Sequence, residues 1–115
     1  MAFMRELAML RTDLLIAPES CDVELTSLLA YQCKISFAYR DEETGEIRPT
    51  LNIRGSSSIL IIDRIDDFRA LRDTIRQVAT SDGEITVALC RYWPSSAQTD
   101  ELRKLGVKEV RTVLT

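Results

Sequence analysis

The chain has 115 residues, of which 45% are hydrophobic and 29% are charged, a balance typical of a globular domain rather than a disordered segment. Its net charge of −3 comes from 15 basic and 18 acidic residues that are interspersed, which argues against a nucleic-acid binder. No apolar run approaches the roughly 20 residues of a membrane span, so the sequence predicts a cytoplasmic protein without a membrane segment.

Histidine is absent, and its absence removes several classes of chemistry. Ser-His-Asp triads, Cys-His dyads and histidine-ligated metal sites all need an imidazole. The three cysteines, Cys21, Cys33 and Cys90, are odd in number and widely spaced, which favours buried free thiols over disulfides. The chain also lacks a Cys-x-x-Cys pair, so neither a metal nor another cofactor is expected.

The first 18 residues form an arm for which the pattern leaves two structures open. Apolar residues recur there every three or four positions, which favours a helix over residues 2–16. The recurring residues are Phe3, Leu7, Leu10 and Leu14. In the alternative, only residues 13–17 are ordered, as a short apolar strand. Pro18 ends either element.

A helix followed by a β-hairpin is expected next. Ser20 or Asp22 is the candidate cap of the helix. Residues 34–40 and 47–53 then alternate between apolar and polar side chains, with a polar turn that contains one glycine between them. Pro49 has no N–H for a ladder hydrogen bond, so the second strand should lie at an edge of the sheet.

The second half of the chain alternates strands and helices. Residues 58–62 and 85–90 are continuous apolar runs, which are typical of strands covered on both faces. Between them a helical stripe of apolar residues follows Asp66 or Asp67, either of which can cap the helix near its positive end. The strand–helix–strand order predicts neighbouring strands joined through a helix.

The last helix is expected to open at Ser95, because Gln98 follows three positions later and completes a capping box. Gly106 suits the position just after that helix, and residues 110–114 form the closing strand. Together the elements predict a single α/β domain over residues 1–115. Its expected architecture is a three-layer α-β-α sandwich with a mixed sheet: an N-terminal helix, a β-hairpin and then β-α-β-α-β.

This order of elements resembles the cytidine and deoxycytidylate deaminase superfamily. The resemblance covers residues 22–114 and puts Ser95 and Gln98 where the family's Pro-Cys-x-x-Cys motif has its two cysteines. Ile65 falls on the histidine of the family's His-Ala-Glu motif, and Asp67 stands where that motif has its glutamate. In the family, the histidine and the cysteines hold a catalytic zinc ion. The resemblance therefore implies a degenerate copy without zinc ligands.

A degenerate deaminase implies a pseudoenzyme, which is not an enzyme and acts through contacts with a protein partner or as a homo-oligomer. The alternative is a regulatory domain that binds a small molecule or a nucleotide through the 91–96 loop and the helix start at 63–67. A third possibility, a metal-independent enzyme, needs a nucleophile–base pair, and Cys90 has no histidine to activate it.

The two loops supply seven candidate binding residues. Tyr92 and Trp93 could stack against a ligand or a partner and Arg91 could pair with an anion, whereas Trp93 could equally close the core. Ser95 and Ser96 could hold a phosphate at a helix start, although capping alone explains Ser95. The seven residues are Arg91, Tyr92, Trp93, Ser95, Ser96, Asp63 and Asp67.

Overall fold

The structure is a computed structural model that describes residues 2–10, 12–49 and 53–113. Its helices are α1 (Ala2–Met9), α2 (Ser20–Cys33), α3 (Phe68–Thr80) and α4 (Ser96–Lys104). Its strands are β1 (Leu14–Ala17), β2 (Ser36–Arg40), β3 (Ile47–Arg48), β4 (Ser57–Ile62), β5 (Glu84–Cys90) and β6 (Glu109–Thr112). None of the described helices is long and apolar enough to cross a membrane.

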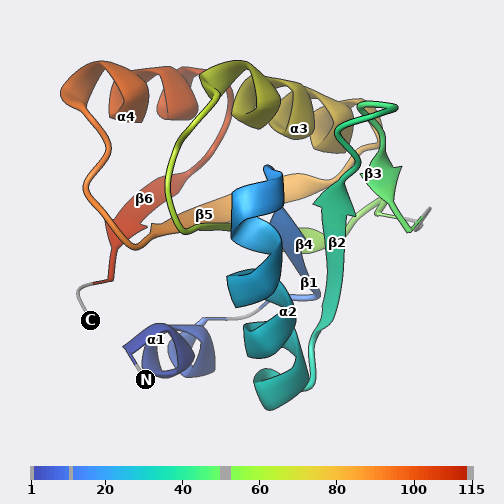
Figure 1. Cartoon of the computed structure of the whole chain (residues 1–115), viewed down its shortest axis with the longest axis vertical. Coiled ribbons are helices and arrows are strands. Elements are labelled where there is room, and N and C mark those ends of the chain that lie inside the picture. The colour runs from blue at the N-terminus through green and yellow to red at the C-terminus, as the bar shows by residue number, and fades with distance from the viewer. Residues whose placement is uncertain (1, 11, 50–52, 114–115) are drawn as a thin grey trace.

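The six strands form one mixed sheet in the order β3-β2-β1-β4-β5-β6. All neighbouring strands run parallel except β2 and β3, which form the antiparallel hairpin at one edge. In Figure 1, α3 and α4 lie above the sheet and α1 and α2 lie below it. The α/β class, the three layers and the mixed sheet that the sequence predicts are therefore confirmed.

Two apolar clusters hold the three layers together, one on each face of the sheet. Alternate residues of a strand point to opposite faces, so Leu60 of β4 packs with α3 and α4 whereas Ile59 packs with α1 and α2. The central strands β1 and β4 are covered on both faces, which is why their apolar residues run without interruption. The two buried faces give a rigid platform for the loops at its edges.

The N-terminal arm contains both of the elements that the sequence left as alternatives. The helix ends at Met9, so the prediction of a helix over residues 2–16 is wrong. Residues 14–17 instead form β1, which pairs with β2 on one side and with β4 on the other. Pairing with two strands buries all four residues, and this outweighs the helical spacing of the leucines. This strand, which the sequence offered as the alternative, lies at the centre of the sheet.

The helix starts agree with the sequence in two cases out of three. Asp67 caps α3 by accepting a hydrogen bond from the Arg69 N–H, and Ser95 forms the expected capping box with Gln98. The cap of α2 is Glu19, which makes no side-chain capping bond, so the expectation of Ser20 or Asp22 as the cap is wrong. The carboxylates of Glu19 and Asp22 instead bind the loop between β4 and α3.

The second strand of the hairpin, β3, lies at an edge of the sheet, as Pro49 predicted. The described part of this strand has two residues. Residues 50–52, part of the expected strand, and residue 114 of the expected closing strand lie outside the described residues. Arg40 of β2 pairs with Asp73 of α3 at 2.8 Å, and Gln77 of α3 accepts a hydrogen bond from the Ile47 N–H at 3.2 Å. The hairpin is thereby fastened to α3.

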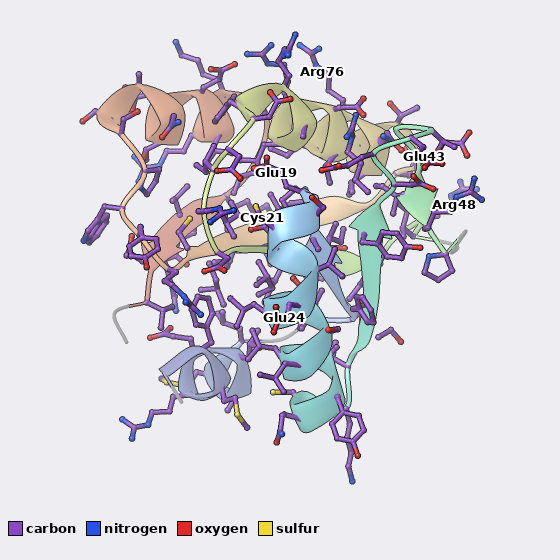
Figure 2. All side chains as sticks on the ribbon, in the orientation of Figure 1. Glu19, Cys21, Glu24, Glu43, Arg48 and Arg76 are labelled. Carbon is purple, nitrogen blue, oxygen red and sulfur yellow. The ribbon has the colours of Figure 1, made fainter. Side chains whose placement is uncertain are left out.

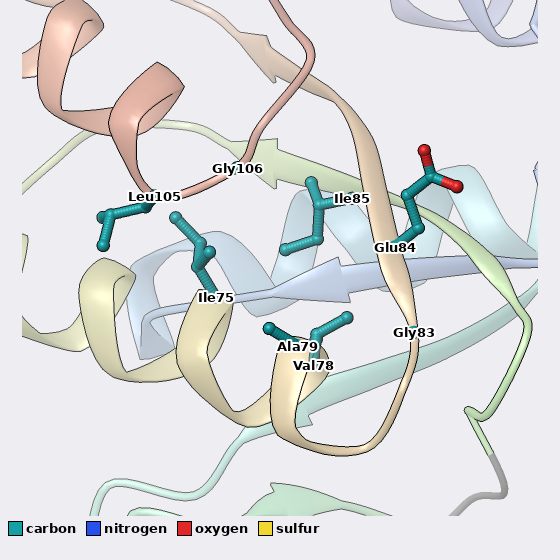
Figure 3. Close-up of a pocket in the computed structure, with 8 residues that line it drawn as sticks. All are labelled: Ile75, Val78, Ala79, Gly83, Glu84, Ile85, Leu105 and Gly106. Atoms are coloured by element: carbon teal, nitrogen blue, oxygen red, sulfur yellow. The ribbon is translucent and has the colours of Figure 1, made fainter.

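The turn from α3 into β5 passes very close to its neighbours at Gly83. A Cβ atom at this position would lie 2.9 Å from the Ile53 carbonyl oxygen and 3.0 Å from Val78 Cγ1. Gly83 lines a hollow of ≈ 110 Å³ between the ends of α3 and α4. Figure 3 shows the residues around this hollow. The side chains of Ile75, Ile85 and Leu105 make this hollow largely apolar. Only glycine has room for the turn.

Candidate ligand site at the carboxyl edge of the sheet

The sheet has a topological switch point between β1 and β4. The chain leaves β1 through α2 towards β2 and leaves β4 through α3 towards β5, so the two connections diverge. α2 and α3 pack on opposite faces of the sheet. In open α/β sheets, ligands bind outside the carboxyl ends of the strands at such a point. The loops after β1, β2, β4 and β5 all lie at this carboxyl edge, because these strands run parallel.

A pocket of ≈ 160 Å³ lies at the carboxyl edge, between the loop at 63–67 and the loop at 91–95. Trp93 is 72% exposed and Tyr92 is 65% exposed, so both stand at the rim and neither closes the core. The lining is apolar and aromatic with two polar side chains. Its residues are Ile62, Arg64, Ile65, Tyr92, Trp93, Pro94 and Gln98. We call this hollow the aromatic pocket.

The structure brings the two predicted loops together. Arg91 Nε lies 2.9 Å from Asp63 Oδ1, and the Arg91 N–H donates to the Ile62 carbonyl oxygen at 2.9 Å. Ser95 and Asp67 are engaged as helix caps, and Ser96 is the exposed first residue of α4. Of the seven candidate residues, Tyr92 and Trp93 line the pocket directly, and Arg91 and Asp63 join its two walls.

Two carboxylates from the start of α2 bind the backbone of the loop between β4 and α3. Glu19 Oε1 accepts a hydrogen bond from the Asp67 N–H at 2.8 Å, and its Oε2 accepts from the Asp66 N–H at 3.1 Å. Asp22 Oδ1 accepts from the Asp63 N–H at 2.7 Å and from the Arg64 N–H at 3.4 Å. The loop is thus held in shape by side chains of another helix.

Burial changes the acidity of these groups. It raises the pKa of Asp22 to about 7, against the lowering effect of the hydrogen bonds from Asp63 and Arg64. Asp22 Oδ2 is also buried and has no hydrogen-bond partner, which adds to the cost of the charged form. Burial likewise raises the pKa of Glu19 above its usual value. The proton is therefore held more tightly here than on an exposed carboxyl group.

Within the described residues, one group of side chains could hold a metal ion. The ligand atoms of Glu19, Cys21 and Asp66 all lie within 4.8 Å of one another. Burial and the charge of Asp22 raise the pKa of the Cys21 thiol to about 12, so the thiol carries its proton at neutral pH. Both Glu19 oxygens already accept hydrogen bonds from the loop. These observations make the group a poor metal site as it stands.

The sequence reasoning missed the two carboxylates that shape the site. Glu19 and Asp22 follow an apolar run and precede a helix, which is the pattern of capping residues, so the sequence signal indicated a local role. Their actual partners lie more than 40 positions away in the chain. The sequence signal for this role is the apolar strand at 14–17, which is followed closely by the two acids Glu19 and Asp22. Of the pocket lining, Ile62 and Gln98 lie outside the two predicted binding loops.

Two further hollows lie at the opposite, amino edge of the strands. One is the apolar hollow beside Gly83, and the other, of ≈ 640 Å³, is lined by Leu10, Thr12, Asp13 and Ser57. Neither has an exposed aromatic side chain in its lining. Of these three hollows, only the aromatic pocket lies at the edge where this type of sheet binds ligands.

The sequence matches no protein-family model and no curated protein, whereas the fold matches several solved structures. The chain is similar to orotate phosphoribosyltransferase from Aeropyrum pernix, with a TM-score of 0.73 and 14% identity over 96% of this chain and 62% of that one. It is also similar to UMP synthase from Leishmania donovani, with a TM-score of 0.77 and 16% identity over 98% of this chain and 25% of that one.

Adenine phosphoribosyltransferase from Thermoanaerobacter pseudethanolicus has the same fold, with a TM-score of 0.63 and 17% identity over 96% of this chain and 77% of that one. The chain spans less than two thirds of the length of the first two proteins. At these identities the likeness establishes the fold, which is that of the phosphoribosyltransferases.

The resemblance to cytidine and deoxycytidylate deaminases is therefore wrong. It depended on a sheet without β1, and the structure places this strand at the centre, where it pairs with β2 and β4. Ile65 and Gln98 do line one pocket, and Ser95 lies beside Gln98. This proximity does not support the deaminase resemblance, because the sheet that brings these residues together has the phosphoribosyltransferase fold. The conclusion of a non-catalytic pseudoenzyme falls with the resemblance, because it rested on the missing zinc ligands of a deaminase, and the matched structures are instead named phosphoribosyltransferases and a UMP synthase.

Proposed function

We propose that the chain is a ligand-binding domain with the phosphoribosyltransferase fold, and that its ligand is a nucleobase, a nucleoside or a nucleotide. The observation that carries the proposal is the aromatic pocket, which lies at the switch-point edge of the sheet and has Trp93 and Tyr92 exposed at its rim. The matched proteins are named for reactions of nucleobases and nucleotides, and this supports the same class of ligand here.

The chemistry of the pocket suits a planar aromatic ring. Trp93 and Tyr92 offer exposed faces on which a base can stack, and Ile62 and Ile65 supply the apolar floor. Stacking of a base on an aromatic side chain contributes about 1–3 kcal/mol. The ion pair of Arg91 with Asp63 links the two loops, although Arg91 Nε makes no hydrogen bond of good geometry, and this link supports a preorganised rim.

The single tryptophan of the chain makes the test direct, because Trp93 is the only indole that can report on binding. Adenine, adenosine and AMP, and then the uracil series, are titrated while the intrinsic fluorescence is recorded. We expect saturable quenching by at least one series, together with a rise in melting temperature by mass action. No change in either signal up to millimolar ligand would refute the proposal.

A matched pair of variants assigns the binding to the pocket. Trp93→Ala removes the stacking surface, so calorimetric titration should show affinity lowered by about 5-fold to 150-fold. Tyr31→Ala is the control, because Tyr31 is 82% exposed but lies near the far end of α2. We expect its affinity to equal that of the wild type. Equal losses in both variants would place the ligand elsewhere.

Transfer of a phosphoribosyl group is a second candidate function, favoured by the names of the matched proteins. It is tested by incubating the chain with a nucleobase and an activated phosphoribosyl donor and separating the products by chromatography. Formation of a nucleotide that Trp93→Ala abolishes would support this activity. Absence of product with a base that binds would restrict the function to binding.

A further inference from the structure

Three helices begin at the carboxyl edge, and oxygen atoms of the chain itself occupy backbone donors at each start. At α2, the Ser20 N–H donates to Glu42 Oε1 at 3.4 Å. At α4, the Gln98 N–H donates to the Ser95 hydroxyl at 3.1 Å. At α3, both oxygens of Glu19 are engaged. Free amides at a helix start are the donors that bind phosphate groups, and the Ser20, Gln98, Asp66 and Asp67 amides are already paired.

The pairing is most complete in the loop at 63–67, which forms one wall of the aromatic pocket. Four of its five backbone N–H groups donate to Glu19 or Asp22. Glu19 is 5% exposed and Asp22 is 0% exposed, so these carboxylates are built into the structure and are not loose surface groups. In Figure 2, Glu19 lies at the N-terminal end of α2, and Glu24 lies further along the same helix.

The charged side chains around this loop also disfavour the binding of a phosphate group. Three arginines lie near the loop, and each is paired with an aspartate of that loop: Arg64 with Asp66, Arg69 with Asp67 and Arg91 with Asp63. Glu19 and Asp22 are not balanced by a further cation in the contacts described for this loop. A phosphate dianion placed here would meet several carboxylates at short range, which disfavours it.

We infer that Glu19 determines ligand specificity: its carboxylate takes the place of a phosphate on the loop and makes the aromatic pocket select an uncharged nucleobase or nucleoside over the corresponding 5′-phosphate. The inference rests on the proposed function for the class of ligand. Its physical content, the exclusion of phosphate from the Asp66 and Asp67 amides, stands on the hydrogen bonds of Glu19 alone.

Paired titrations test the selectivity. A nucleoside and its 5′-monophosphate are titrated against Trp93 fluorescence for the wild type, for Glu19→Gln and for the control Glu24→Gln, which changes an exposed glutamate of the same helix. We expect the wild type and the control to favour the nucleoside about tenfold or more, a difference of about 1.4 kcal/mol. Glu19→Gln should reduce that ratio towards one. A wild-type preference for the monophosphate, or a ratio unchanged in Glu19→Gln, overturns the inference.

A second measurement decides the inference even if no nucleoside binds, a result that would count against the proposed function alone. Inorganic phosphate is added to isotope-labelled protein and the backbone amide resonances of Asp66 and Asp67 are followed. In the wild type they should stay in place up to millimolar phosphate, and in Glu19→Gln they should shift with saturation. The dispersed spectrum of the variant shows that it is folded. Saturable shifts in the wild type, or none in the variant, overturn the inference.

Discussion

At the scale of single residues, Asp22 shows how burial and hydrogen bonding oppose each other. Its carboxyl group is fully buried and one oxygen accepts two backbone hydrogen bonds, but the other oxygen has no partner. Burial prevails and raises the pKa to about 7. The folded chain therefore binds this proton more tightly than the unfolded chain, in which an aspartate has a pKa of about 4.

This shift predicts a pH dependence of stability. Because the folded-state pKa is the higher one, the free energy of unfolding should fall as the pH rises from about 4 to about 7 and level off above that. At about 1.4 kcal/mol for each pKa unit, Asp22 contributes up to about 4 kcal/mol to the fall. Glu19 acts in the same direction. In Asp22→Asn, the part of this pH-dependent fall that Asp22 contributes should be absent.

Urea unfolding of the wild type and Asp22→Asn across that pH range measures the effect. The stability of the variant relative to the wild type should rise with pH, since the variant has no proton to lose. Carboxyl groups that do not interact with Asp22 contribute equally to both proteins and cancel in the difference, whereas Glu19, whose charge acts on Asp22, is part of the measured effect. Parallel pH profiles for the two proteins would show that Asp22 does not titrate in this range.

At the scale of elements, the helix starts carry both stability and the geometry of the site. Ser95 accepts from the Gln98 N–H at 3.1 Å, and Gln98 Oε1 accepts from the Ser95 N–H at 3.0 Å. The same turn places Pro94 and Gln98 in the wall of the aromatic pocket. Loss of the capping box should therefore loosen that wall as well as the helix.

Ser95→Ala should lower the free energy of unfolding by about 1 kcal/mol, within a range of about 0.5–2 kcal/mol, because a helix donor loses its partner. Ser96→Ala is the matched control, since Ser96 is exposed and stands one position later, inside α4. Its effect should stay within about 0.5 kcal/mol. Denaturant unfolding compares the two variants, and equal costs would contradict the role of the capping box.

The sequence predicts those elements whose signals are local. The capping box at Ser95, the cap at Asp67 and the apolar strands at 58–62 and 85–90 all follow from residues within a few positions of one another, and the structure confirms them. The strand at 14–17 was ambiguous because its stability comes from two partners far along the chain. The same holds for the site, where Glu19 meets its partners only in the folded sheet.

At the scale of the whole molecule, the two ends of the described chain belong to one apolar cluster. Phe3 and Leu7 of α1 pack in the same cluster as Leu29 of α2 and Val113 near the end of β6. Arg111 of β6 pairs with Glu6 of α1 at 3.0 Å. A single domain over residues 1–115 stays a prediction, and these contacts show how it can be tested.

Phe3→Ala should destabilise the whole domain by about 3–5 kcal/mol, because the side chain is fully buried and leaves a cavity. Met9→Ala in the same helix is the control, since Met9 is 83% exposed, and its effect should stay within about 0.5 kcal/mol. Circular dichroism and Trp93 fluorescence should show one coincident transition. A first transition confined to α1, or a Phe3→Ala cost below about 1 kcal/mol, would separate the arm from the domain.

The association state is a property of the whole molecule. The expectation of a protein partner or a homo-oligomer stays a prediction, as does the cytoplasmic location. Leu28 and Tyr31 are exposed apolar residues on one side of α2, but single exposed apolar residues are common on monomers.

The narrow turn at Gly83 has a consequence for how this sequence can diverge. A Cβ atom at position 83 would overlap the Ile53 carbonyl and the Val78 side chain, so a substitution of Gly83 requires both neighbours to move. Related sequences that keep this turn should therefore retain glycine there while the nearby surface varies freely. An alignment of such sequences would show position 83 as one of the slowest-evolving sites outside the aromatic pocket, although Gly83 does not line that pocket.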